Sequence, residues 1–179
     1  MQKYIALLRG VNVGGKNKLP MAGLKAALTA AGYADVSTYI QSGNVFFSSN
    51  ETEPEALQAG IRAAIEESFG LTVPVCVISA RELDEAVTHA PEWWGTDENA
   101  THNAIFVIAP ASVEDIYAEV GQLKPEYEKA ASNGRVIFWS APISTYSRTR
   151  LSRVVGSKVY DAITIRNVNT TRKLCELAK

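Results

Sequence analysis

The chain has 179 residues, of which 46% are hydrophobic and 21% are charged, and its formal net charge at pH 7 is −1. This composition excludes a disordered, collagen-like or low-complexity chain, and a chain of this length can form a core without disulfides or a structural metal. A net charge near zero also argues against strong nonspecific binding to duplex nucleic acid, which usually requires a basic domain.

The first part of the chain, residues 1–78, has the pattern of a ferredoxin-like half. We predict strands at residues 3–9, 36–40, 45–47 and 72–78, and helices at residues 20–32 and 52–70. Pro20 suits the first turn of the first helix, and Thr52 begins a capping box for the second. A hairpin turn is predicted at residues 41–44. The resulting order, βαββαβ, is that of the ferredoxin-like unit.

Residues 79–101 predict a connecting helix, opened by a capping box at Ser79, and then an acidic, aromatic linker. The last part, residues 102–179, predicts strands at 102–109, 127–131 and 135–140, with a helix capped by Ser112 and a hairpin turn at Asn133-Gly134. The pattern after Pro142 is helical, so this half reads βαββα and lacks a fourth strand. We therefore predict an α+β fold of two ferredoxin-like halves with C-terminal helices.

The glycine-rich loop after the first strand comes close to a P-loop. Gly10, Gly15 and Lys16 have Walker A spacing, but Asn17 replaces the residue that ligates Mg²⁺ and the helix begins only at Pro20. No later strand ends in the aspartate that a Walker B site needs, so the sequence argues against a P-loop NTPase. Backbone N–H groups of a glycine-rich turn beside lysines still favour an anion.

In the ferredoxin-like topology the first βα loop and the hairpin lie at the same end of the sheet, so amides and lysines should gather there. The candidate binding residues of this half are Arg9, Asn12, Gly14, Gly15, Lys16, Asn17, Lys18, Gln41, Ser42 and Asn44. Such donors suit a phosphate, a carboxylate or a nucleobase edge. In the alternative interpretation, the glycines only turn the chain and the asparagines cap loop amides.

Charge is distributed in blocks: residues 1–25 hold five basic groups and no acid, residues 82–128 hold eleven acids and one lysine, and residues 142–175 hold seven basic groups and one acid. The last block supplies the other candidate binding residues, Arg150, Arg153, Arg166, Asn167, Asn169 and Lys173. Arg150 and Arg153 would share a helix face, and Asn167 or Asn169 would cap the last helix. In one interpretation these cations pair with the acidic block, where each exposed ion pair stabilises the fold by only ~0–1 kcal/mol. In the other, the two basic blocks meet around one anionic ligand.

The sequence nominates no catalytic residue, metal or cofactor. His89 and His102 have no metal-ligand spacing and no nucleophile motif beside them, so we expect hydrogen-bonded or exposed histidines. Cys76 and Cys175 lie far apart in the sequence and suit reduced thiols, and no apolar run is long enough to cross a membrane. We therefore expect a cytoplasmic protein without a membrane partner.

Three motifs resemble those of the bacterial domain-of-unknown-function family numbered 1697. They are LRGVNVGGKNKLPM at residues 8–21, YIQSGNV at residues 39–45, and the pattern Thr164-x-Arg166-Asn167-x-Asn169-Thr170-x-x-Lys173-Leu174. The resemblance covers essentially the whole chain and implies a compact α+β fold with ferredoxin-like halves, but no activity. Val168 departs from the aromatic residue of many relatives, which puts a stacking role at that position in doubt.

Three functional hypotheses remain open. The first is a binding module for an anionic small molecule such as a nucleotide, or for single-stranded RNA. The second is a metal-independent enzyme for a small phosphorylated or carboxylated metabolite, in which Lys16 or Arg166 stabilises developing charge. The third is an assembly protein, for example a homodimer, in which the open sheet edge of the second half pairs with another copy.

Overall fold

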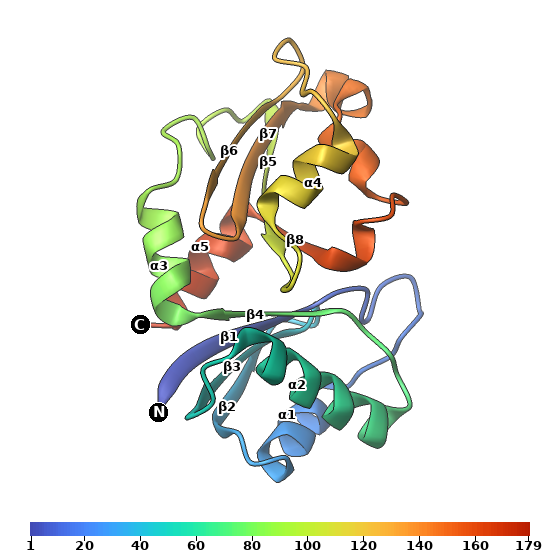
Figure 1. Ribbon diagram of the computed structural model, residues 1–179, viewed down its shortest axis with the longest axis vertical. Helices are drawn as coiled ribbons and strands as arrows, with labels where there is room; N and C mark the ends of the chain where they lie inside the picture. Colours follow the sequence, from blue (N-terminus) through green and yellow to red (C-terminus); the bar gives the residue numbers. More distant parts are fainter. The chain divides into compact units, whose positions relative to one another are not determined.

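The computed structural model describes residues 1–179 and divides into two compact units, each built on a four-stranded antiparallel sheet (Figure 1). The first unit contains Met1–Leu83 together with Leu177–Lys179, and the second contains Asp84–Glu176. The predicted α+β class with two ferredoxin-like halves is confirmed by the order of the elements and of the strands in each sheet.

In the first unit, both helices cover one face of the sheet (Figure 1). Its elements are β1 (Gln2–Leu8), α1 (Met21–Ala30), β2 (Ala34–Tyr39), β3 (Asn44–Ser49), α2 (Pro54–Phe69) and β4 (Val75–Ser79), with the strand order β2-β3-β1-β4. Leu24 and Leu28 of α1, and Ile61 and Ile65 of α2, are fully buried at the i, i+4 spacing of one helix face. Burial of each such side chain stabilises the fold by about 1.5–3 kcal/mol.

The second unit repeats this topology. Its elements are the end of α3 (Ala80–Thr88), β5 (Ala100–Val107), α4 (Val113–Val120), β6 (Lys129–Asn133), β7 (Val136–Pro142), β8 (Ile163–Asn167) and α5 (Val168–Leu177), with the strand order β6-β7-β5-β8. The last residues of α5 belong to the first unit. Alternate residues of this sheet, including Ile105, Ile137 and Trp139, form a core with α4.

β8 corrects the prediction that the second half lacks its fourth strand. It pairs antiparallel with β5, with Arg166 opposite Ala104 and Ile165 opposite Ile105. Isoleucine alternates with polar residues along β8, which is a strand pattern, but the segment is short and lies in a basic stretch that we assigned to helix. The edge on which the assembly hypothesis depended is therefore occupied.

The segment between β7 and β8 forms three 3₁₀ helices instead of the predicted α-helix. They are η1 (Ile143–Arg148), η2 (Leu151–Val154) and η3 (Tyr160–Ala162). Leu151 and Val154 are three residues apart, so they lie on the same side of a 3₁₀ helix. Both are fully buried in the core beside α4. Arg150 precedes η2 as its N-cap residue, so Arg150 and Arg153 do not share an α-helical face as predicted.

Trp94 anchors the predicted linker to the sheet of the second unit. Its ring lies 4.8 Å from that of Phe138 in a T-shaped arrangement, and its Nε1 donates to the Asn103 carbonyl oxygen at 2.8 Å. The Arg172 guanidinium lies 5.4 Å from the Trp94 ring and donates to the Trp94 carbonyl oxygen. This segment is therefore packed structure rather than an open connection.

The predicted capping box is present at the start of α3 but not at the start of α2. The predicted box forms at Ser79 and Glu82, each of which accepts the other's backbone N–H. The Thr52 box is wrong, because α2 has Glu53 as its N-cap residue and no side-chain cap. Instead, the Glu51 carboxylate accepts the N–H groups of Thr52 and Glu53, and these hydrogen bonds hold the pKa of Glu51 below its ordinary value.

Both hairpin turns lie within one residue of the predicted positions. Asn44 begins β3, so the first turn covers residues 40–43 rather than 41–44. In the second hairpin Asn133 pairs with Val136, which places Gly134 and Arg135 in the turn. Gly134 has φ +55, as the first central position of a type II′ turn requires.

Candidate functional site

Two asparagines hold the loop between β1 and α1 in one conformation. Asn12 Nδ2 donates to the carbonyl oxygens of Leu19 and Gln41, both at 2.8 Å, and its Oδ1 accepts from the Leu19 N–H. Asn17 Nδ2 donates to the Gly10 carbonyl oxygen at 3.0 Å. Both asparagines have positive φ, 55° and 47°, which asparagine tolerates better than most residues. The loop is thereby joined to the β2–β3 hairpin.

The tip of this loop is a turn made by Gly14 and Gly15. Their φ values are 57° and 74°, and the turn is closed by a hydrogen bond from Lys16 N to the Val13 carbonyl oxygen at 3.0 Å. Two successive residues at positive φ fit a type I′ turn, which glycine enters without steric cost. A β-carbon on either glycine would meet no atom within 4 Å, so the surface around the tip is open.

The side chains around the tip combine positive charge with apolar surface. Lys16 and Lys18 are exposed, and neither forms an ion pair or a side-chain hydrogen bond. Val13 is 63% exposed and Ile40, in the adjoining hairpin, is 47% exposed. Ile40 has φ +51°, a strained conformation for a β-branched residue. We call residues 13–18 and 40–42 the loop–hairpin surface.

The other predicted residues described in the first unit form hydrogen bonds within that unit. Asn44 is fully buried, and its Nδ2 donates to the Tyr39 carbonyl oxygen at 3.1 Å and to Ser42 Oγ at 3.0 Å. Arg9 is half-buried, and its N–H donates to the Pro74 carbonyl oxygen. The amides of Asn12, Asn17 and Asn44 are thus engaged within the unit, a role that the sequence had left as the alternative.

In the second unit, three of the predicted residues have structural partners. Arg166 is buried in β8, where its Nη1 donates to Thr164 Oγ1 and to the Ile165 carbonyl oxygen, both at 2.9 Å. Asn167 Oδ1 accepts the Thr170 N–H at 2.8 Å, which confirms Asn167 as the cap of α5. Lys173 forms an ion pair with Glu176 at 2.8 Å. Asn169 and Arg153 are exposed on α5 and η2.

A protein carboxylate already occupies the start of η2. Glu128 is buried, and its two oxygens accept the N–H groups of Arg150 at 2.7 Å, Leu151 at 3.1 Å and Lys124 at 3.2 Å. Arg150 itself is half-buried, and its Nε is enclosed without a hydrogen-bond partner. Burial and, secondarily, the Glu128 charge raise the pKa of Tyr117. The acidic block therefore holds this part of the basic block in place.

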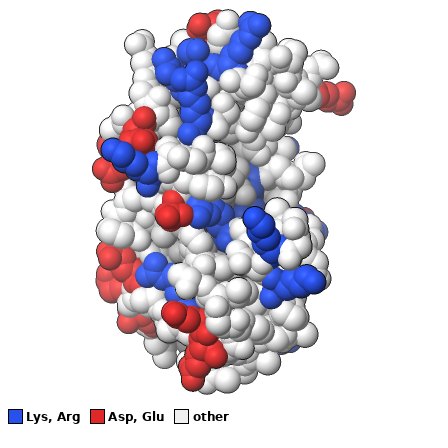
Figure 2. All heavy atoms as spheres, turned by 90° about the vertical axis from the view of Figure 1, so that its right-hand side faces the viewer, with Lys and Arg blue, Asp and Glu red and all other residues white.

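The candidate binding residues thus divide between the units, ten in the first and six in the second. In each unit basic and acidic side chains both reach the face drawn in Figure 2. That both groups contact one ligand stays a prediction.

The second unit contains a polar cluster that is not among the residues predicted from the sequence. His102 on β5 and Ser140 on β7 face each other across the strand pair and are hydrogen-bonded through Nδ1 and Oγ. His102 Nε2 is bonded to the Asp97 carbonyl oxygen at 2.8 Å. Both side chains line a hollow of about 280 Å³. Because 38 positions separate the two residues, no local motif could have signalled the pair.

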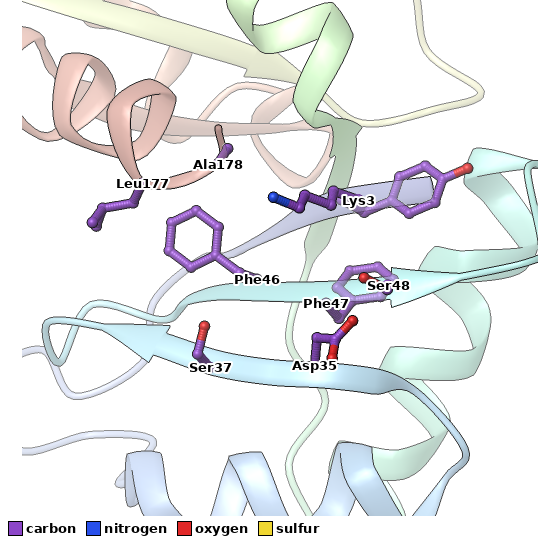
Figure 3. Close-up of a pocket in the computed structure, with 9 residues that line it drawn as sticks. Lys3, Asp35, Ser37, Phe46, Phe47, Ser48, Leu177 and Ala178 are labelled. Atoms are coloured by element: carbon purple, nitrogen blue, oxygen red, sulfur yellow. The ribbon is translucent and has the colours of Figure 1, made fainter. Parts of the chain in front are cut away.

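A smaller hollow, of about 200 Å³, lies on the sheet of the first unit (Figure 3). Phe46 and Lys3 extend there toward Leu177 and Ala178, and Lys3 Nζ donates to a backbone oxygen of Lys179 at 2.8 Å. The polar side chains around it come from Asp35, Ser37 and Ser48. Leu177 and Ala178 therefore form part of the border of this hollow.

The structure contains no group of three or more His, Cys, Asp or Glu side chains that could hold a metal ion. Cys76 and Cys175 are free and buried. None of the helices is both long enough and apolar enough to span a bilayer.

Comparisons with known proteins agree with the resemblance seen in the sequence. The profile of a family described as "Protein of unknown function (DUF1697)" matches residues 1–138, so the C-terminal motif lies beyond the matched part. A solved structure, the conserved bacterial protein SP0830 from Streptococcus pneumoniae, is 29% identical, with 99% of each chain covered and a TM-score of 0.87. No curated protein matches the chain at a significant level.

Proposed function

Since the chain belongs to the DUF1697 family, whose function is unknown, we propose a function from the geometry of the first unit: the loop–hairpin surface binds an anionic ligand, either a nucleotide or single-stranded RNA. The observation that carries the proposal is the pair of exposed lysines, Lys16 and Lys18, without ion pairs on a loop fixed by internal hydrogen bonds. No acidic residue precedes Asp35 in the sequence, so this region offers the lysines no local partner.

The fixed conformation of the loop favours binding, because the loop loses little conformational entropy when a ligand binds. Asn12 and Asn17 fix the two ends of the glycine turn, so the ligand does not have to offset the entropy of ordering a mobile loop. The backbone N–H groups of Gly14 and Gly15 have no partner within the protein. They can donate to phosphate oxygens together with the two ammonium groups.

The apolar side chains at the same surface narrow the ligand class. Val13, in the same turn as Lys16, and Ile40, in the hairpin that Asn12 joins to this loop, expose aliphatic surface, which inorganic phosphate would leave uncovered. A nucleotide carries both a charged phosphate and the apolar face of a base. We therefore favour nucleotides, free or in a single strand, over small inorganic anions.

The experiment is a titration of the protein into a short fluorescein-labelled oligouridylate at several salt concentrations, with ATP and inorganic phosphate as competitors. Phosphate contacts make the logarithm of the binding constant fall linearly with the logarithm of the salt concentration, by roughly 0.7 per contact for single strands. The double variant K16A/K18A should therefore bind more weakly and with a slope that is lower by roughly 1.4. ATP should compete better than phosphate.

Lys25→Ala is the matched control, because Lys25 is an exposed lysine of the same unit on α1, outside the loop. It removes one positive charge, as Lys16→Ala or Lys18→Ala alone would, and should leave the affinity near that of the wild type. Absence of binding to both the oligouridylate and ATP, or an equal loss in K25A and K16A, would refute the proposal.

A cytoplasmic location, where nucleotides and RNA are abundant, is part of the same proposal. It is consistent with the two cysteines being free thiols. Cell fractionation with an antibody against the protein tests it.

A further inference from the structure

The hydrogen bonds of His102 determine which of its ring nitrogens carries the proton. Nε2 lies 2.8 Å from the Asp97 carbonyl oxygen, which can only accept, so Nε2 is the donor. In the neutral ring Nδ1 then has no hydrogen, and it accepts the hydroxyl of Ser140. The serine proton therefore points at a basic nitrogen, which is the relation between a nucleophile and its general base.

The base is itself held by a third group on a fixed turn. The Asp97 carbonyl oxygen also accepts the Ala100 N–H at 3.2 Å, and Asp97 Oδ1 accepts the Asn99 N–H at 2.9 Å. In a catalytic triad, a serine is hydrogen-bonded to a histidine, and a carboxylate accepts a hydrogen bond from the other ring nitrogen. The arrangement here is the same, except that a backbone carbonyl takes the place of the carboxylate. We propose that Ser140 and His102 form the nucleophile and general base of an acyl-transfer site.

The surroundings of the pair indicate a small substrate. The hollow of about 280 Å³ lies just below the usual range of about 300–1,000 Å³ for ligand pockets. Ser140 is 6% exposed and His102 is 8% exposed, so only a slender group reaches them. The residues that line it include the aromatic Trp93 and Tyr127 and the acidic Asp97 and Glu126. These features fit an uncharged ester or thioester with a short acyl group.

Lys129 is the cation nearest to Ser140 in strand register. It lies directly opposite Ser140 on β6, so the two side chains project from the same face of the sheet. Lys129 lines the same hollow, is exposed, and forms no ion pair or side-chain hydrogen bond. Its ammonium can stabilise the negative charge that forms on a carbonyl oxygen during attack.

In the proposed reaction Ser140 Oγ bonds to the acyl carbon, its proton passes to His102 Nδ1, and the carbonyl electron pair moves to the oxygen. When the carbonyl re-forms, the bond to the leaving alkoxide or thiolate breaks, and that group takes the proton from Nδ1. A water molecule then attacks the acyl-serine in the same way, which releases a carboxylic acid and restores the hydroxyl. No electrons are transferred, so no oxidant or reductant is required.

The test treats the full chain with a short-chain alkyl fluorophosphonate, which phosphonylates activated serines with loss of fluoride, and follows the adduct by intact mass and peptide mapping. Wild-type protein should acquire one adduct, on Ser140, and should hydrolyse p-nitrophenyl acetate. His102→Asn keeps an amide oxygen near the position of Nδ1 but cannot take up a proton. It should lower the labelling rate by about 10²–10⁴-fold.

Two further variants separate chemistry from folding. Ser140→Ala should abolish the adduct, whereas Ser132→Ala, at an exposed serine on β6, should leave the labelling rate unchanged. Melting temperatures check that each variant is folded. The wild-type measurement is decisive by itself: absence of an adduct on Ser140 overturns the proposal, and so does labelling of folded His102→Asn at the wild-type rate. Both readouts are independent of the loop–hairpin surface.

Discussion

The Asn12 side chain donates a hydrogen bond to the carbonyl oxygen of Gln41 at 2.8 Å, across 29 positions of the sequence. The same amide group also donates to Leu19 and accepts from it, so one half-buried residue closes the glycine loop and joins it to the hairpin. The lysines of the loop–hairpin surface owe their fixed framework to this residue. Its stability contribution and its effect on binding are therefore linked.

Asn12→Asp tests that link. The substitution keeps an acceptor for the Leu19 N–H, but it places a carboxylate oxygen against the carbonyl oxygens of Leu19 and Gln41. We expect the free energy of unfolding in urea to fall by about 2–3 kcal/mol, since two donated bonds are lost. Asn17→Asp loses one exposed bond, to Gly10, and should lose about 1 kcal/mol or less. Equal losses would contradict the assignment.

Gly43 is required by the hairpin for two reasons. Its φ is +79°, and a β-carbon there would lie 2.7 Å from Leu8 Cβ and 2.8 Å from Val11 Cγ2. Gly43→Ala therefore combines backbone strain with overpacking, and we expect a loss of about 2–5 kcal/mol in the free energy of unfolding. Gly14→Ala has comparable φ strain in open space and should lose only about 1–2 kcal/mol. The difference between the variants, measured in urea, isolates the packing contribution, and losses of the same size would show that packing does not matter there.

The sequence predicted the elements whose signals are local. α1 begins at Met21, one residue after the predicted start, with Pro20 as its N-cap residue, and Gly70 ends α2 in the left-handed conformation. Both hairpins lie within one residue of the predicted positions. β8 was not predicted, because apolar and polar residues alternate over only four positions, Ile163 to Arg166. This strand signal is too short to outweigh the helical signals on either side.

The candidate site was less accessible to sequence reasoning, because burial decides what a polar side chain does. Asn44 and Lys16 looked equivalent as candidate ligands, yet Asn44 is enclosed in its hairpin and Lys16 is exposed. The pairing of His102 with Ser140 depends on the register of β5 against β7, which residue spacing does not contain. Sequence therefore located the loop but could not separate its framework from its surface.

Glu128→Gln tests how the start of η2 is held. The carboxylate accepts three backbone N–H groups in a buried position, and an amide would turn its NH₂ group toward one of these donors. We expect a loss of about 2–3 kcal/mol in the free energy of unfolding, measured in urea. Glu126→Gln removes the same charge from an exposed neighbour and should change stability by less than about 0.5 kcal/mol. A similar effect of both variants would indicate a general charge effect instead.

The capping box of α4 predicts a stability difference that depends on pH. Hydrogen bonds from the backbone N–H of Ser112 and then from its side chain lower the pKa of Asp115. A carboxyl group with a lowered pKa in the folded state stabilises the protein above its unfolded pKa, about 3.9, and loses this contribution as the pH falls through the folded value. Asp115→Asn should therefore be less stable than the wild type at neutral pH.

At a pH well below the lowered folded-state pKa of Asp115, the Asp115→Asn variant should unfold at the same urea concentration as the wild type, because the wild-type carboxyl is then also uncharged. Ser112→Ala provides the contrast. It removes the hydroxyl that accepts the Asp115 N–H at 3.2 Å, a bond that needs no charge on Asp115, so a loss of about 1 kcal/mol should persist at both pH values. If the Asp115→Asn deficit were the same in acid as at neutral pH, its cause would be lost packing or geometry rather than the carboxylate charge.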